Sequence, residues 1–384
     1  MKDVKALFRV CTVYQLINAI NVRIQMLKKD ICADIILCAS TDFSLFGENL
    51  KRINIFDHVI YSDDTTHTNR ALRALDTEKK KTVFDHPEDY FELIHVNEKE
   101  MKAEDFFRDR EYNEFYISVD DEYSMLIYYY ILNQGYRMNI HIFDESKATY
   151  VLDIPKRYKE LGFPHSKFGN NQYINSIKEI ILYEPELNLA PDFGAEIIQL
   201  PKIDVKDSEI CNIYKTVFGY NDVPKEKFIY FEGPFFWDEF VMNDLDVLEE
   251  FANIVGKDNI IVKMHPRDKI DRYTCRGYKV MDNSIIPWEI TTMLCDLSKK
   301  VLVTITSNAV MTGDFVFDIQ NKIIQLDKLL SIGQQADALK RFNVFDKNFI
   351  KYFNSKTQHY YRPDSLEELK EIIIYLKGVI RRNV

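Results

Sequence analysis

Three apolar runs with the pattern of buried strands are each followed directly by side chains that could do chemistry. The residues at these three strand ends are Glu232 and Gly233, then Lys263, His265, Pro266 and Arg267, then Thr306, Ser307 and Asn308. Parallel strands present their carboxyl ends at one edge of a sheet, where open α/β sheets bind ligands, so we expect these residues to lie close together. A histidine, hydroxyls and a carboxylate at such an edge could hold a nucleotide phosphate, protonate it as it leaves and deprotonate an incoming nucleophile.

Each of these residues also has a purely structural interpretation. His265 beside a phosphate could act as a cation or acid, or it could simply end a strand, with Pro266 setting the turn. Ser307 could bind an anion or cap a helix. Glu289 stands in the first turn of a helix begun by Pro287, where a carboxylate could accept hydrogen bonds from a ribose or oppose the helix dipole. Only the combination indicates a site.

Composition excludes several classes of protein. The 384-residue chain carries a formal net charge of -10, so it lacks the basic surface of a nucleic-acid binder. It contains no apolar run of about 18 residues, the length that a membrane-spanning helix needs. Its six cysteines show no metal-binding spacing, and we expect them to be buried thiols in a reducing compartment.

The nearest match to a metal-binding Asp-x-Asp motif is "ISVDDEY". Asp120 and Asp121 in this segment stand where a helix is expected to begin, and acidic residues are favourable there because of the helix dipole. We therefore expect no metal.

Strand and helix patterns alternate in both halves of the chain, which predicts α/β domains with parallel sheets. We expect an N-terminal domain over 1–200 with a polar insertion at about 62–102, and a C-terminal domain over 201–384. The irregular, proline-containing stretch from Tyr150 to about Asp204 is expected to connect them. Two facing Rossmann-like, doubly wound domains with a cleft between them are the predicted architecture.

The order of motifs resembles the bacterial sialyltransferases of glycosyltransferase family 52, the lipooligosaccharide sialyltransferase group. The resemblance rests on "MHPR", then "PWE", then "TSNA". The N-terminal "VCTVYQLINAI" looks like that family's opening strand and helix, and "IHIFDESKATY" resembles its "FDDG" segment. The resemblance extends from about Leu7 to about Ala309, and its specificity comes from the order and spacing of the motifs.

The resemblance implies a GT-B fold, CMP-sialic acid as the donor, inversion at the anomeric carbon and no catalytic metal or other cofactor. By residue, it implies that His265 is the acid, that Glu289 binds the nucleotide and that Ser307 belongs to the phosphate and donor site. The family's base is an Asp soon after a Gly-x-Pro-like turn. Here Asp238 is the nearest aspartate, displaced by "FFW", and Glu232 is the competing base.

The acceptor is expected at the strand ends of the N-terminal domain. Thr12, Tyr14 and Gln15 follow its first strand, and Asp144 opens the segment that resembles "FDDG". That segment has Ser146 where the family has glycine, so we expect the loss of any backbone conformation that needs a positive φ.

These features predict an inverting, metal-independent sialyltransferase that modifies a terminal galactose of a bacterial surface glycan, either lipooligosaccharide or capsule. Two alternatives stay open: transfer of another CMP- or CDP-activated group, such as a different nonulosonic acid, Kdo or a polyol phosphate, and a catalytically inactive GT-B-like binding subunit. The expected location is the cytoplasm, and peripheral contact with the inner face of the plasma membrane is compatible with the sequence. A homodimer is compatible with the sequence. The amphipathic C-terminal segment "LKEIIIYLKGVIRRNV" is expected to pack against the body of the protein rather than on lipid.

Overall fold

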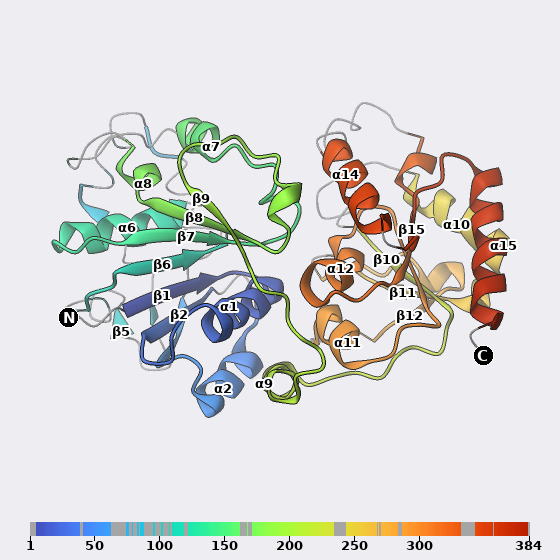
Figure 1. Cartoon of the computed structure of the whole chain (residues 1–384), viewed down its shortest axis with the longest axis horizontal. Coiled ribbons are helices and arrows are strands. Elements are labelled where there is room, and N and C mark those ends of the chain that lie inside the picture. The colour runs from blue at the N-terminus through green and yellow to red at the C-terminus, as the bar shows by residue number, and fades with distance from the viewer. Residues whose placement is uncertain are drawn as a thin grey trace. The chain divides into compact units, whose positions relative to one another are not determined.

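The computed structural model divides the chain into two compact units (Figure 1). The first contains residues 1–203 and 216–218, and the second contains residues 204–215 and 219–384. The structure describes residues 5–38, 41–62, 74–76, 79, 83, 85–87, 95–96, 101–102, 107, 110–118, 122–161, 167, 171–233, 243–266, 268, 270–282, 286–331, 342–355 and 357–382.

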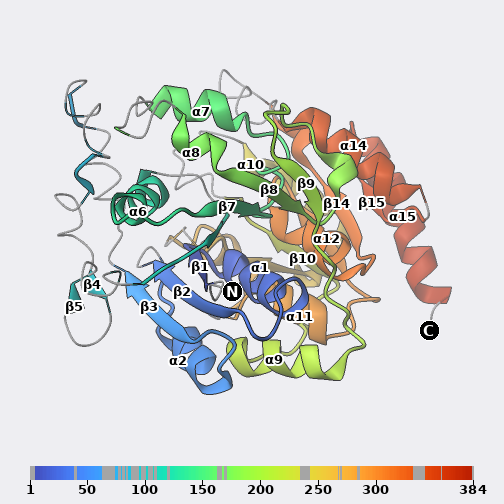
Figure 2. The ribbon, with the colours of Figure 1, turned by 60° about the vertical axis from the view of Figure 1, so that its left-hand side comes forward.

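The first unit is built on a sheet in which β1 lies between β2 and β6. In sheet order, the described strands are β5 (Met101–Lys102), β4 (His95–Val96), β3 (His58–Ser62), β2 (Cys32–Cys38), β1 (Lys5–Val10), β6 (Glu114–Ile117), β7 (Asn139–Phe143), β8 (Ile177–Leu182) and β9 (Glu196–Gln199). All neighbouring pairs from β3 to β9 are parallel. β4 and β5 add antiparallel pairing beyond β3 (Figure 2).

Helices connect these strands on both sides of the sheet. They are α1 (Val13–Gln25), α2 (Ser44–Ile53), α6 (Glu122–Asn133), α7 (Ile154–Leu161) and α8 (Gln172–Asn175), with a 3-10 turn at Pro185–Leu187. Helix α6 is buried on all its faces, from Glu122 through Leu132, as its almost continuous run of apolar and tyrosine side chains predicts.

The second unit repeats the same winding with six strands, all parallel. In sheet order they are β12 (Lys279–Val280), β11 (Ile260–Lys263), β10 (Phe228–Phe231), β13 (Val301–Thr304), β14 (Lys322–Gln325) and β15 (Tyr360–Tyr361). The helices are α9 (Ser208–Phe218), α10 (Asp244–Val255), α11 (Trp288–Leu294), α12 (Thr312–Phe317), α14 (Asn343–Asn354) and α15 (Leu366–Arg382). Short 3-10 turns lie at Lys257–Asn259, Thr274–Arg276, Asn308–Met311 and Asp327–Leu329.

The expected fold class is confirmed, because both sheets have the strand order of a Rossmann fold. In each unit the chain winds outward from a first strand in one direction and then crosses to its other side. The resulting neighbours are β3, β2, β1 and β6 in the first sheet and β12, β11, β10 and β13 in the second. Two such units in one chain make up a GT-B fold. In each, the point where the winding reverses, between β1 and β6 and between β10 and β13, is where this fold class binds ligands.

The stretch from Tyr150 to Asp204 is not a simple connection, and this part of the prediction is wrong. It contains α7, α8 and the strands β8 and β9, which extend the first sheet. Its prolines lie at element starts and in loops, for example Pro155 in the first turn of α7 and Pro185 at the start of a 3-10 turn, where proline is tolerated. The structural division falls after Ile203, and residues 216–218 return to the first unit.

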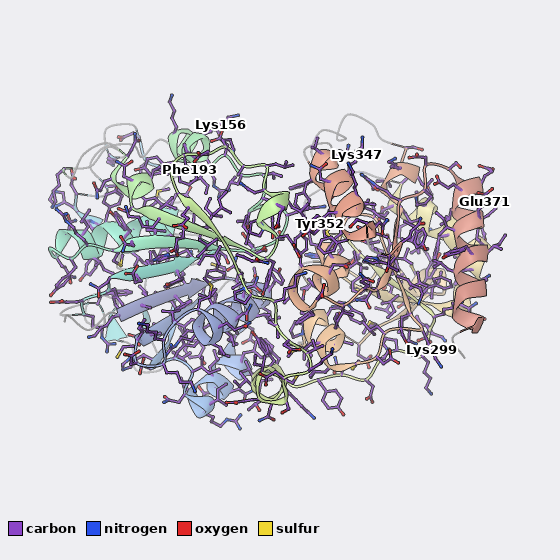
Figure 3. All side chains as sticks on the ribbon, in the orientation of Figure 1. Lys156, Phe193, Lys299, Lys347, Tyr352 and Glu371 are labelled. Carbon is purple, nitrogen blue, oxygen red and sulfur yellow. The ribbon has the colours of Figure 1, made fainter. Side chains whose placement is uncertain are left out.

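Helix α15 packs against the second sheet, as expected. Leu369, Ile373 and Leu376 are buried in one core cluster with side chains of α10 and of the central strands. Charged side chains such as those of Lys156 on α7 and Lys347 on α14 lie at the surface (Figure 3). Within the described residues, no helix combines the length and the apolar character that a membrane crossing requires.

All six cysteines are free thiols. The expectation that they are buried is wrong for most of them, because only Cys38 is buried, whereas Cys32 and Cys275 are exposed. Cys32 is the first residue of β2, and its apolar neighbours in the sequence do not bury it. Cys275 lies between two polar residues in the 3-10 turn Thr274–Arg276.

Candidate functional site

The strand ends of the second unit bring the predicted residues to one rim of the sheet. Phe231, the last residue of β10, pairs with Lys263 of β11 on one side and with Thr304 of β13 on the other. Glu232 therefore follows the central strand at the point where the winding reverses. His265 and Ser307 come two and three residues beyond their strands' paired positions, and those two strands are about 10 Å apart because neighbouring strands are about 4.8 Å apart.

Glu232 is almost completely buried, with 2% of its surface exposed, and both carboxylate oxygens accept hydrogen bonds. Oε2 accepts the backbone N–H of His265 at 2.9 Å. Oε1 accepts from the Arg272 guanidinium at 2.9 Å and from the Tyr273 hydroxyl at 2.8 Å. Burial raises the pKa of Glu232, although these three donors oppose the shift. A carboxylate that is so fully occupied is better suited to holding the chain than to accepting a proton from a substrate.

His265 and Pro266 form a turn directly after β11. The His265 backbone N–H is held by Glu232, and its carbonyl accepts the backbone N–H of Asp268 at 3.0 Å. The side chain is half-buried, and Pro266 is exposed. The main chain of His265 is thus fixed at both its amide and its carbonyl, at the rim of the sheet.

Lys263 and Glu289 are ionisable neighbours on the inner side of this rim. Burial lowers the pKa of the Lys263 amine, and the charge of Glu289 opposes that shift. Burial also raises the pKa of Glu289, although a hydrogen bond from its own backbone N–H and the charge of Lys263 oppose that shift. Glu289 belongs to α11, whose first residue, Trp288, packs edge-on against Phe231 with ring centroids 4.9 Å apart. The pair therefore lies beside the end of the central strand.

The turn after β13 is held by hydrogen bonds of the Thr304 hydroxyl. The Thr304 hydroxyl donates to the Phe231 carbonyl at 3.0 Å and accepts the backbone N–H of Ser307 at 2.8 Å. Ser307 precedes the 3-10 turn that begins at Asn308, but its side chain makes no capping hydrogen bond. The capping interpretation of Ser307 therefore fails, because its half-buried hydroxyl does not cap the start of this turn.

Helix α11 and the turn after β13 contain three polar atoms that are buried without a hydrogen-bond partner among the described residues: Trp288 Nε1, Thr292 Oγ1 and Asn308 Oδ1. Buried polar atoms in native proteins nearly always have partners, so each such atom is a candidate ligand contact. Asn308 was expected at the donor site. Trp288 and Thr292 were not, although the tryptophan lies inside the "PWE" motif.

In the first unit the expected acceptor residues meet in a polar network at the ends of β1 and β7. Gln15 accepts the backbone N–H of Cys11 at 2.6 Å and donates to Glu145 at 2.8 Å. Tyr14 is half-buried and hydrogen-bonds to Asp144. Thr12 is exposed and caps α1, its hydroxyl accepting the Gln15 backbone N–H at 3.2 Å. Three of the four expected residues therefore belong to one cluster, and Thr12 has a capping role.

Asp144 is the centre of this cluster and is 1% exposed. Burial raises its pKa to about 7, against hydrogen bonds from the Tyr150 hydroxyl and other donors. The Tyr150 hydroxyl lies 2.6 Å from Asp144 Oδ2, and the Asn18 amide holds the Asp144 carbonyl at 2.7 Å. A carboxyl group with a pKa near neutrality can both accept and release a proton under physiological conditions.

Ser146, two residues further along, corrects one prediction. The replacement of glycine was expected to remove a backbone conformation with positive φ, yet Ser146 has a φ of 142°. A non-glycine residue in such a conformation costs on the order of 1–3 kcal/mol, and such strain is concentrated at functional sites. The backbone at Ser146 therefore has a positive φ although the residue is not a glycine.

Several predicted residues lie outside the described residues. Asp238 and Arg267, expected as base and donor contact, are among them, and so are Asp120 and Asp121. Gly233 is described and buried at the end of β10. In the part of the chain that the structure describes, no three or more His, Cys, Asp or Glu side chains are grouped as a metal site would require.

Comparison with known proteins finds similarity of structure only. No protein-family model and no curated protein matches the sequence. A sialyltransferase from Photobacterium damsela is a similar solved structure, with a TM-score of 0.46 and 13% identity over 94% of this chain and 81% of that chain. The spinosyn rhamnosyltransferase SpnG has a TM-score of 0.49 and 9% identity over 98% of this chain and 91% of that chain. At these identities the likeness concerns the fold alone.

The sequence reasoning missed the residues that surround Glu232. Asp244, Arg272 and Tyr273 lie in the start of α10 and in the loop after β11, outside every recognisable motif. Arg272 could not be singled out because one arginine among many charged residues has no distinguishing pattern. Its role depends on contacts between segments far apart in the sequence.

Proposed function

We propose that this chain is an inverting sialyltransferase that uses CMP-sialic acid and needs no metal ion. The observation that carries the proposal is the rim of the second sheet, where His265, Ser307 and the Lys263–Glu289 pair meet at the point of winding reversal. The three buried polar atoms without partners support a polar ligand there. The donor class rests on the resemblance of the "MHPR", "PWE" and "TSNA" series alone.

The reaction breaks the bond between the anomeric carbon of sialic acid and a phosphate oxygen of CMP. His265 donates a proton to that oxygen or stabilises its negative charge as the bond breaks. CMP leaves with a single phosphate, whose charge a cationic imidazole and neighbouring hydroxyls can balance without a divalent ion. The acceptor hydroxyl attacks the opposite face of the sugar, which inverts the anomeric carbon.

The donor is held by the rim residues. Glu289 accepts hydrogen bonds from the ribose, Lys263 supplies a positive charge close to it, and Ser307 with Asn308 binds the phosphate. Thr306, Gly233, Pro266 and Arg267 complete the donor contacts. Trp288 and Thr292 join this set because their buried polar atoms have no partner among the described residues.

The general base follows from the same resemblance, which implies Asp238, a residue outside the described ones. Glu232, the competing base, is less suited to that role, because its oxygens are engaged by three protein donors. Asp144, Tyr14 and Gln15 of the first unit are the proposed acceptor contacts. We propose that the acceptor is the terminal galactose of a lipooligosaccharide or capsule, modified in the bacterial cytoplasm.

The test is CMP release from CMP-sialic acid in EDTA, with and without lactose, by the wild type and by His265→Ala. Loss of an acid or of its charge lowers the rate by about 100-fold or more, so we expect that loss in His265→Ala. His58→Ala is the matched control, because His58 is a partly exposed histidine paired with Asp34 in the first unit. Lactose should increase release by the wild type.

Two outcomes would contradict the proposal. Equal release by wild type and His265→Ala would remove His265 from the reaction. Absence of release by the wild type, with release from another CMP- or CDP-activated donor, would replace sialic acid as the transferred group.

A further inference from the structure

A buried ion-pair network joins the end of β10, the start of α10 and the loop after β11. One guanidinium nitrogen of Arg272, Nη2, lies 2.9 Å from Glu232 Oε1 and 2.9 Å from Asp244 Oδ2. Tyr273 donates to the same Glu232 oxygen at 2.8 Å and lies 3.3 Å from Arg272 Nη2. Glu232 and Asp244 are 2% and 3% exposed, and Tyr273 is fully buried.

This network is costly to form, because two carboxylates and a guanidinium have to leave water. Buried ion pairs often contribute little net stability compared with apolar packing, so they are weak evidence of a purely stabilising role. What they can do well is fix geometry, because each partner is left with an uncompensated charge if it moves. The network should therefore hold its three segments in one arrangement.

The segment that it fixes is the one that carries His265. The second oxygen of Glu232 accepts the His265 backbone N–H at 2.9 Å, so the position of that carboxylate decides where the histidine main chain stands. Arg272 and Tyr273 hold the first oxygen and set the orientation of the carboxylate. Arg272, seven positions after His265, binds the same carboxylate that holds the His265 amide.

We propose that Glu232 and Arg272 are positioning residues, which fix the main chain of His265 at the rim of the second sheet through a buried carboxylate shared with Tyr273. The consequence for turnover rests on the proposed function, whereas the fixed position of the loop does not. A displaced histidine lowers the rate of the chemical step more than it weakens donor binding.

The experiment compares Arg272→Lys with Arg362→Lys. Arg362 is the matched control, a buried arginine of the same unit that binds Asp327 and Asn343, away from His265. Lysine keeps the charge, but its side chain is one bond shorter than that of arginine, so its ammonium does not reach the Nη2 position that bridges Glu232 and Asp244. Two quantities are measured: hydrogen exchange of the backbone amides over residues 264–270, and kcat and KM for CMP release from CMP-sialic acid.

We expect Arg272→Lys to speed exchange of the His265 amide by about tenfold or more, because that amide opens locally. It should lower kcat by about 10- to 100-fold while KM for the donor changes less than kcat. Arg362→Lys should change neither the exchange over 264–270 nor the ratio of kcat to KM. Equal effects of both variants, or no effect of Arg272→Lys, would overturn the proposal.

Tyr273→Phe keeps the inference testable if Arg272→Lys does not fold. It removes only the hydroxyl that donates to Glu232, and Tyr360→Phe is its control, because the buried Tyr360 hydroxyl donates to Gln325 at 2.8 Å. Faster exchange of the His265 amide in Tyr273→Phe alone supports the proposal, and the same exchange in both variants overturns it. If the wild type releases no CMP, the proposed function fails, and the exchange measurement still decides whether the network fixes the loop.

Discussion

Two buried carboxyl groups, Glu232 and Asp144, stand directly after strands of the two units, and their surroundings differ in kind. Glu232 is bound by a guanidinium, a hydroxyl and a backbone N–H. Asp144 is bound by neutral donors, among them Tyr150 and Tyr14. Burial disfavours the charged form of both groups. The Arg272 guanidinium opposes that effect at Glu232, whereas burial raises the pKa of Asp144 to about 7.

Asp144→Asn should stabilise the fold. The pKa of Asp144 is raised from 3.8 to about 7, so the folded state binds more protons than the unfolded state between these values. The free energy of unfolding of the wild type therefore falls, relative to Asp144→Asn, as pH rises from about 4 to about 7, by about 4 kcal/mol in total. Urea unfolding at pH 4, 5.5, 7 and 8 measures this difference.

Transfer of sialic acid to lactose, measured in Asp238→Asn, tests the assignment of the base. We expect a loss of about 100-fold or more. Full activity in Asp238→Asn would contradict the assignment.

At the scale of elements, His141 links three neighbouring strands of the first sheet. From β7 its two ring nitrogens contact Glu179 of β8 at 2.6 Å and Glu114 of β6 at 2.7 Å. Its ring stacks on Tyr116 with centroids 4.5 Å apart. Burial opposes the charged imidazole, but hydrogen bonds and charges of the two glutamates outweigh burial and raise the pKa of His141. The sheet is thus joined by a charged cross-strand group as well as by its ladders.

His141→Gln should cost about 2 kcal/mol, because it removes hydrogen bonds between charged groups. Since the pKa of His141 is raised, the stabilisation is fully present below pH 6.5 and is lost as pH rises through the folded-state pKa. The hydrogen bond from His141 lowers the pKa of Glu179, so the contribution of that glutamate is present above pH 4.5 and is lost as pH falls. The difference from wild type should therefore be largest between pH 4.5 and 6.5.

The measurement is chemical unfolding of His141→Gln and wild type across that pH range. His58→Gln is the control, because His58 also pairs with a carboxylate of the first unit but is largely exposed, and such pairs contribute about 0–1 kcal/mol. A constant difference between His141→Gln and wild type from pH 5 to pH 9 would show that the imidazole is not charged in the folded protein.

At the scale of the whole molecule, the chain enters the second unit at Asp204 and returns briefly to the first at residues 216–218. Phe218, at the end of α9, is buried and packs on Phe46 of α2 with ring centroids 5.1 Å apart. Asn49 of α2 donates to the Val217 carbonyl at 2.8 Å. Ten residues later, Phe228 is buried in the core of the second unit.

Phe218→Ala and Phe228→Ala should therefore destabilise different units, each by about 3–5 kcal/mol, the usual cost of removing a buried phenylalanine. Hydrogen exchange followed by mass spectrometry measures the effect segment by segment. We expect faster exchange in β1, β2 and β6 for Phe218→Ala, and in β10, β11 and β13 for Phe228→Ala. The same pattern for both variants would mean that the two units unfold as one.

The sequence by itself determined the fold class and the location of the candidate site. Apolar runs of strand length, alternating with amphipathic helices, predict parallel sheets because only those periods bury side chains in such layers. They placed His265, Glu232 and Ser307 at strand ends, and the topology does bring those ends to one rim. Strands β8 and β9 were missed, because prolines at their flanks resemble a linker when no neighbouring strand is in view.

Only the tertiary structure decided what individual carboxylates do. The difference between Glu232 and Asp144 depends on Arg272, which reaches the end of β10 from a loop 40 positions later. The pKa of Asp144 depends on burial by Tyr150 and its neighbours. Charge, pKa and hydrogen-bond occupancy are properties of a three-dimensional environment, and side chains distant in sequence create it. A local pattern can name a reactive residue, but its protonation and its partners are fixed only when the chain has folded around it.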